Sequence, residues 1–148
     1  VTRVPERMYR QSAVIPYRQG RDGLEVLLVT SRKGKRWVLP KGVIEPGLSA
    51  VASAAKEAME EAGIRGAIDD EPLGTYKYDK WGGTCSVQVF AMAVEEEAAD
   101  WPEAGMRRRT WLTIDEARRR VDEQGLKQIF DRFNSACGQV RGTESPDL

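Results

Sequence analysis

The stretch from Lys41 to Ile64, KGVIEPGLSAVASAAKEAMEEAGI, constrains the fold of this chain more than any other. Glycines and a proline precede a run of good helix formers, Ser49 is a suitable N-cap, and Gly63 is a suitable stop. On a period of 3.6 residues one narrow face carries only small side chains, from Val51, Ala54, Ala55, Ala58 and Ala62. A helix with such a face can pack closely on a sheet, which predicts a layered domain.

Short apolar runs on both sides of this helix are typical of β-strands. We expect strands at 11–17, 24–30, 37–39, 73–78, 86–94 and 108–112, helices at 48–62, 113–123 and 126–135, and surface loops at 66–71 and 81–84. Interleaved strands and helices predict an α/β fold with a mixed central sheet. A chain of 148 residues can form a single core. We therefore expect one domain over residues 1–138 and a disordered tail over 139–148.

The composition excludes several functional classes. Lys and Arg together number 23, as do Asp and Glu, so the overall charge attracts neither nucleic acid nor a membrane. The absence of His removes Ser-His-Asp and Cys-His catalysis and imidazole metal sites. No apolar run approaches the about 20 residues of a membrane span, and the two cysteines match no metal-ligand spacing. We expect a cytoplasmic protein whose chemistry rests on carboxylates, lysine, tyrosine or bound water.

Three carboxylates crowd one turn of the predicted helix. Glu57, Glu60 and Glu61 stand at positions i, i+3 and i+4, where like charges repel by only about 0.2–0.5 kcal/mol per pair. A solvated acidic flank tolerates that repulsion and is the common interpretation of such a cluster. The alternative is a site for a hard divalent cation such as Mg²⁺, which prefers several oxygen ligands.

The surrounding residues favour the metal site. Gly42, followed at fixed spacing by KEAMEEAGI at 56–64, resembles the Nudix hydrolase signature. That signature is a glycine, five residues, glutamate, seven residues, arginine-glutamate, an aliphatic residue, any residue, two glutamates, any residue, glycine and an aliphatic residue. The sequence departs from this signature at two positions: Leu48 stands where the first glutamate is expected, and Lys56 replaces the arginine. Ala58 is also small for its aliphatic position. The segments VLLVTSRKGKRWVLPKG and TWLTIDEARRRV also resemble Nudix segments, so the resemblance covers about residues 10–135.

The resemblance implies a Nudix-type α/β/α sandwich and Mg²⁺- or Mn²⁺-dependent hydrolysis of a phosphoanhydride. Metal ions neutralise phosphate charge, lower the pKa of bound water and orient the leaving group. Carried over by position, the metal ligands are Glu57, Glu60, Glu61 and the Gly42 carbonyl, and the catalytic residues are Glu57, Glu60 and Lys56. Lys56 would hold a glutamate in place, although it lacks the planar fork of arginine. Because Leu48 also removes a carboxylate, a catalytically degenerate, ligand-binding module is an alternative to an active enzyme.

The substrate must be inferred from residues that lie outside the signature. The basic candidates for binding it are Arg10, Arg32, Lys33, Arg36, Lys41 and Lys77. If they converge on a cleft, they suit a ligand with more phosphates than a diphosphate, whereas scattered charges would only solvate the surface. The wider segments resemble most the Nudix branch that cleaves diphosphoinositol polyphosphates and diadenosine polyphosphates. An ADP-ribose or nucleotide-sugar pyrophosphatase is the runner-up.

Four aromatic residues are candidates to stack on a base, namely Tyr17, Tyr76, Tyr78 and Trp81. Each could equally be a packing residue. We expect a small-molecule phosphoanhydride substrate, no nucleic-acid or membrane partner, and a monomer or homodimer.

Overall fold

The computed structural model describes residues 7–143, with side chains described as far as Cys137. Its strands are β1 (Met8–Gly20), β2 (Gly23–Thr30), β3 (Trp37–Val38), β4 (Lys41–Val43), β5 (Ile64–Ile68), β6 (Gly74–Lys80), β7 (Gly83–Glu97) and β8 (Arg109–Thr113). Its helices are α1 (Ala50–Glu57), continued by the π-helical turn η1 (Ala58–Ala62), then α2 (Ile114–Arg120) and α3 (Gln124–Thr143).

The long strand β1 organises the sheet. It runs parallel to β7 from Met8 to Tyr17 and antiparallel to β2 and β4. The strand order is β3-β2-β1-β7-β5, with β4 paired to β1, β6 to β7 and β8 to β2. One parallel pair among antiparallel ones confirms the predicted mixed sheet.

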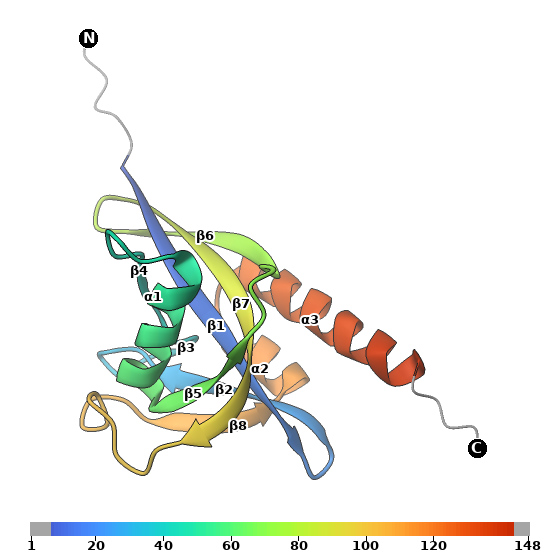
Figure 1. The fold of residues 1–148 in the computed structure, drawn as a ribbon. Helices are drawn as coiled ribbons and strands as arrows, with labels where there is room; N and C mark the ends of the chain where they lie inside the picture. The colour runs from blue at the N-terminus through green and yellow to red at the C-terminus, as the bar shows by residue number, and fades with distance from the viewer. Residues whose placement is uncertain (1–6, 144–148) are drawn as a thin grey trace.

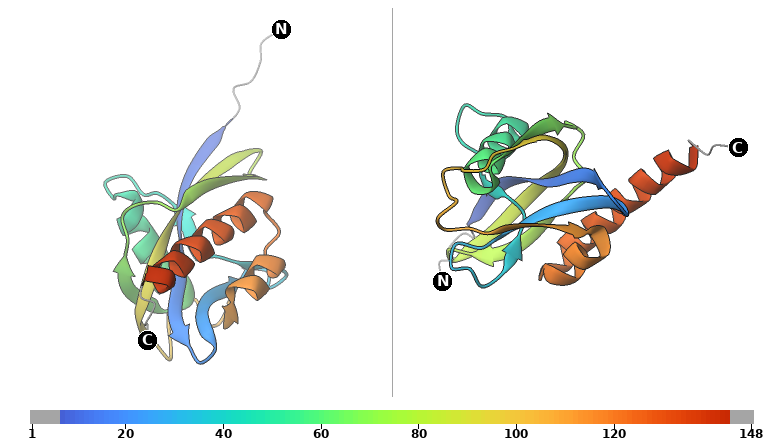
Figure 2. Two further views of the ribbon diagram at one scale, coloured as in Figure 1. Left: turned by 90° about the vertical axis from the view of Figure 1, so that its right-hand side faces the viewer. Right: turned by 90° about the horizontal axis from the view of Figure 1, so that it is seen from below.

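Helices cover both faces of this sheet (Figures 1 and 2). Along β1 successive side chains point to opposite faces. Val14 therefore packs with Ala54 and Ala58 of the α1–η1 segment, while Ile15 packs in a second core with Ile129 and Phe130 of α3. These two buried layers confirm the predicted α/β/α sandwich.

The motif helix begins and ends where its sequence predicts. The Ser49 hydroxyl accepts a hydrogen bond from the Ala52 N–H at 3.0 Å, as an N-cap does. Gly63 ends the helix in the left-handed conformation, with φ of 67°. The predicted single α-helix is nevertheless wrong in its last turn, which is π-helical from Ala58 to Ala62.

Other boundaries differ from the sequence-based expectation. Part of the predicted 66–71 loop belongs to β5, which pairs with β7 around a bulge at Arg65 and Gly66. The short strand β4 was not expected, because it has only three residues. Helix α3 continues to Thr143, so residues 139–143 of the expected tail are helical, and 144–148 lie outside the described residues.

Within residues 7–143, no helix combines the length and the hydropathy that crossing a bilayer would require.

Candidate active site

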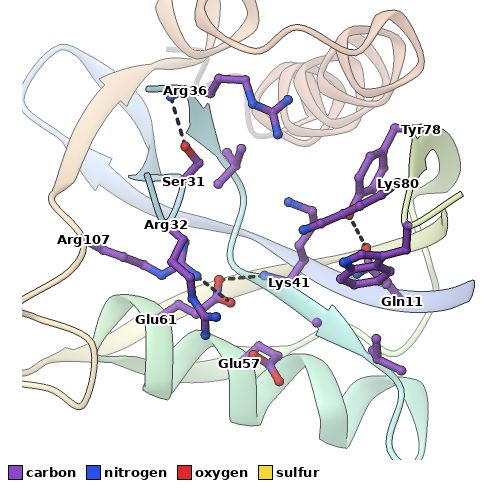
Figure 3. Close-up of a pocket in the computed structure, with 14 residues that line it drawn as sticks. Gln11, Ser31, Arg32, Arg36, Lys41, Glu57, Glu61, Tyr78, Lys80 and Arg107 are labelled. Atoms are coloured by element: carbon purple, nitrogen blue, oxygen red, sulfur yellow. Dashed lines mark hydrogen bonds and ion pairs between the residues drawn. The ribbon is translucent and has the colours of Figure 1, made fainter. Parts of the chain in front are cut away.

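A cavity of about 320 Å³ opens between the motif helix, β4 and the β6–β7 hairpin. Figure 3 shows Glu57 and Glu61 from the helix at one side, Tyr78 and Lys80 at the other, and Lys41 between them. The remaining lining residues are Gln11, Ser31, Arg32, Arg36, Val38, Gly42, Val43, Trp81 and Arg107. Segments far apart in sequence thus bring an acidic end and a basic, aromatic end into one cavity.

Glu57 lies against the backbone of Gly42. A Cβ atom at position 42 would collide with the Glu57 carboxylate, so the glycine allows this close approach. Burial, followed by the charges of Glu61, Glu60 and Glu103, raises the pKa of Glu57 to about 7. A carboxylate in this setting gains more from a nearby cation than an exposed one does.

Glu61 is more deeply buried and already has partners. Only 7% of the residue is exposed. One carboxylate oxygen accepts a hydrogen bond from the Lys41 N–H at 3.2 Å, and the other lies 3.3 Å from the Arg107 guanidinium. Burial raises the pKa of Glu61, and the Arg107 charge opposes that shift. Glu61 is therefore held in one orientation at the cavity wall.

Glu60 does not line this cavity, in contrast to its predicted role beside Glu57 and Glu61. It borders a separate groove with Met59 and Arg65. The π-helical turn explains the difference, because it has roughly one residue more per turn than an α-helix. In such a turn, side chains four residues apart point in nearly the same direction from the helix axis, whereas side chains three residues apart point in different directions. Glu61 therefore lies on the same side of the helix as Glu57, and Glu60 does not.

Lys56 does not hold a motif glutamate, so the predicted positioning contact is wrong. Its ammonium pairs with the Glu45 carboxylate at 2.6 Å, and both side chains are more than 40% exposed. The backbone N–H of Glu45 also donates to the Ser53 hydroxyl at 3.1 Å. Lys56 therefore contacts the loop that precedes the helix, and it does not position the helix carboxylates Glu57, Glu60 and Glu61.

Three of the six predicted basic residues line the cavity, namely Arg32, Arg36 and Lys41. Burial lowers the pKa of Lys41, against the opposing charges of Glu61 and Glu123. Arg36 also pairs with Glu123 at 3.3 Å. Lys80, which is outside the predicted substrate-binding set, lines the cavity as well.

The other three predicted basic residues do not line it. Arg10 borders a different small pocket, and Lys33 and Lys77 are exposed outside the cavity lining. The aromatic candidates divide in the same way. Tyr78 and Trp81 line the cavity, whereas Tyr76 belongs to the core and Tyr17 packs against it.

The β7–β8 loop contributes residues that sequence reasoning missed. Arg107 pairs with Glu103 at 2.6 Å and donates to the Thr30 carbonyl at 2.9 Å, in addition to contacting Glu61. The Glu103 N–H donates to the Glu60 carbonyl at 3.1 Å. Arg107 stands in the run MRRR, whose local pattern does not distinguish it from its exposed neighbour Arg108.

The same loop completes the end of the motif helix. The Trp101 indole N–H donates to the Glu61 carbonyl at 2.9 Å, and the Arg109 guanidinium donates to the Ala62 carbonyl at 2.8 Å. Carbonyls at a helix C-terminus lack partners within the helix and carry partial negative charge, which these donors satisfy.

The donor set fits a divalent cation that brings its own waters. Across residues 7–143, no three carboxylate or thiol side chains are gathered into a ready metal site. Glu57 and Glu61 nevertheless share the cavity with the Gly42 backbone. Hard cations such as Mg²⁺ usually bind through one or two carboxylates, retained waters and substrate phosphates.

Comparisons with known proteins agree with this geometry. Residues 8–133 match the family model of the NUDIX domain. The chain is 30% identical to Nudix hydrolase 13, mitochondrial, of Arabidopsis thaliana, over 93% of this chain and 79% of that protein. It is also 30% identical to diphosphoinositol polyphosphate phosphohydrolase 3-alpha of Mus musculus, over 76% of this chain and 69% of that protein.

The fold matches solved structures as well. The binary complex of a C. elegans Ap4A hydrolase superposes with a TM-score of 0.75 at 21% identity, covering 88% of this chain and 98% of that one. The sequence-based prediction of the family is confirmed: the chain belongs to the Nudix hydrolase family, a family of pyrophosphohydrolases.

Proposed function

We propose that this protein is an Mg²⁺- or Mn²⁺-dependent hydrolase that cleaves a phosphoanhydride bond in a nucleoside- or inositol-linked polyphosphate. The observation that carries the proposal is the division of the cavity into a carboxylate end, with Glu57 and Glu61, and a basic end, with Lys41 and Lys80 (Figure 3). Diadenosine polyphosphates and diphosphoinositol polyphosphates are the favoured substrates, in keeping with the names of two similar proteins.

Each end has a distinct task. Glu57, Glu61 and the Gly42 carbonyl would hold the cation, which when bound neutralises phosphate charge and lowers the pKa of a coordinated water. Arg107 keeps Glu61 in place through a buried ion pair. Lys41 and Lys80 meet phosphates beyond the bond that is cleaved, because cations at a cavity wall bind anionic oxygens strongly. Arg32 also lines the cavity, on the side of Glu57 and Glu61 (Figure 3).

A turnover assay with Mg²⁺ or Mn²⁺ tests this function. The panel comprises diadenosine polyphosphates, diphosphoinositol polyphosphates, ADP-ribose and nucleoside triphosphates. Hydrolysis of a polyphosphate in preference to ADP-ribose is the expected result. Turnover without added divalent metal, or a preference for ADP-ribose, would contradict the proposal.

A ligand-binding module without catalysis is the second candidate. It is favoured by the motif departures Leu48 and Lys56 and by the pairing of Lys56 with Glu45 instead of a motif glutamate. Saturable binding of a polyphosphate with no release of product in the presence of Mg²⁺ or Mn²⁺ would establish it. The protein is further proposed to be a cytoplasmic monomer or homodimer.

Arg32 and Lys33 offer a matched test of what a basic residue in the cavity lining contributes to substrate binding. Both side chains are exposed, and Arg32 lines the cavity whereas Lys33 does not. We expect Arg32→Gln to raise KM about fivefold for a substrate with four or more phosphates, the effect of an exposed ion pair worth about 1 kcal/mol. The change in KM should be smaller for a diphosphate, and kcat should stay nearly constant.

Lys33→Gln is the control and should leave both constants unchanged. The Arg32 effect should also shrink at high salt, since exposed charges are screened over about 10 Å at 0.1 M. Equal KM changes for the two variants would show that the loop charge acts without contacting the substrate.

A further inference from the structure

The β6–β7 hairpin places a tryptophan in an unfavourable backbone conformation at the cavity. Lys80 pairs with Gly83 across the hairpin, so Trp81 and Gly82 form a two-residue turn. Their φ values are 56° and 69°, and Trp81 is the one non-glycine residue with positive φ among residues 7–143. Such turns strongly favour Asn or Gly at the first position, and a bulky residue there is an outlier.

The Trp81 side chain does not compensate for this strain by burial. The residue is 53% exposed, among the most exposed large apolar residues in the described part of the chain. Its ring meets Tyr9 edge-on with centroids 5.2 Å apart, and the Lys80 ammonium lies 4.5 Å from the indole centroid. A strained backbone conformation combined with an exposed apolar ring at a cavity is typical of a functional position.

The neighbouring groups indicate what the indole binds. Trp81 lines the same cavity as Tyr78, Lys80 and Lys41, and the Lys41 ammonium lies 5.4 Å from the Tyr78 ring centroid. Aromatic platforms beside cations suit a ligand with a planar ring joined to phosphates. An inositol ring is saturated and has no π-face, so it would gain little from this platform.

We propose that Trp81 is a specificity-determining residue that stacks on a nucleobase, so that the substrate class is a nucleoside or dinucleoside polyphosphate. This inference rests on the proposed hydrolase function, because it identifies the moiety carried at the basic end of the same cavity. Of the two substrates favoured above, the inference selects the diadenosine polyphosphate and disfavours the diphosphoinositol polyphosphate.

The test compares two probes that differ by the base alone. AMP and ribose 5-phosphate are titrated into the protein by NMR in the absence of turnover. Wild type should bind AMP at least about fivefold more tightly, the lower end of what stacking on an aromatic side chain contributes per base. Trp81→Asn should abolish the difference by weakening AMP binding, with ribose 5-phosphate unaffected, and Trp81→Phe should retain most of it.

Thermal unfolding supplies a second readout. Trp81→Asn should raise Tm or leave it unchanged, because Asn suits the first position of this turn. Met106→Ala is the control, since Met106 is 50% exposed but lies outside the cavity lining, and it should preserve the preference for AMP. Equal binding of the two probes by wild type, or an AMP preference that survives in Trp81→Asn, would overturn the inference.

The two proposals fail separately. If no phosphoanhydride is hydrolysed but AMP binding depends on Trp81, the base subsite stands and the hydrolase proposal falls. If diadenosine tetraphosphate is hydrolysed with the same KM by wild type and Trp81→Asn, the hydrolase proposal stands and the base subsite falls.

Discussion

Glu57→Gln should lower kcat at least about a hundredfold, the scale on which losing one group that stabilises transition-state charge acts. Glu57 lies in the cavity against Gly42, and the amide keeps its volume while removing the charge that a cation needs. Glu60→Gln is the matched control, because Glu60 stands three residues further along and outside the cavity lining. Steady-state kinetics with Mg²⁺ measure both variants, and an equal loss in Glu60→Gln would contradict the placement of the two carboxylates.

Glu57→Gln should also change how thermal stability depends on pH, which can be measured without an activity assay. Because the pKa of Glu57 is raised to about 7, ionising it costs the metal-free folded state free energy. Wild type and Glu57→Gln should have similar Tm values below pH 4.5, where the carboxyl is neutral in both the folded and unfolded states. As pH rises from about 4.5 to about 7, the unfolded state ionises first, so wild type should progressively lose stability relative to the variant, and the loss should be complete above about 7.

Added Mg²⁺ should reverse that order above pH 7. A ligand that binds only the folded state stabilises it, so Tm should rise with Mg²⁺ in wild type and much less in Glu57→Gln. Protonation competes with the cation, so the rise should weaken as pH falls below 7. A Tm rise of the same size in both proteins would show that the cation binds elsewhere.

Arg107→Met should reduce the free energy of unfolding by about 3–5 kcal/mol, the usual cost of removing one partner from a buried ion pair. The Arg107 side chain is 9% exposed and contacts Glu61, Glu103 and the Thr30 carbonyl. Its loss leaves two carboxylates without their main counter-charge. Denaturant unfolding measures the effect, which should correspond to a fall in Tm of about 10 °C for a chain of this length.

Arg118→Met is the matched control for Arg107. Arg118 also pairs with a carboxylate, Asp131, through two N–H groups at 2.8 and 3.1 Å, but both side chains are exposed. Exposed pairs contribute at most about 1 kcal/mol. Adding Glu61→Gln to Arg107→Met should restore part of the loss, because one unpaired buried charge is removed. Equal destabilisation by the two arginine variants would rule out a buried role for Arg107.

Local features of the sequence were sufficient to predict both ends of the motif helix and the family, but not the π-helical last turn. Ser49 caps the helix and Gly63 ends it because both act on the adjacent backbone, a short-range effect that residue type controls. Ala54, Ala58 and Ala62 of the predicted small-residue face pack against the sheet, whereas Ala55 borders a groove. The alternation of strands and helices likewise predicted the mixed sheet between two helical layers.

Tertiary structure decided which charged residues share the cavity. Glu60 and Glu61 are adjacent in sequence, yet Glu61 lines the cavity with Glu57 while Glu60 borders a separate groove. Arg32 and Lys33 are adjacent in a loop, and only Arg32 lines the cavity. Arg107 reaches Glu61 across 46 positions of sequence, and a local charge pattern carries no information about such a partner. Residue type sets what a side chain can do, but the packing of distant segments sets which side chains meet.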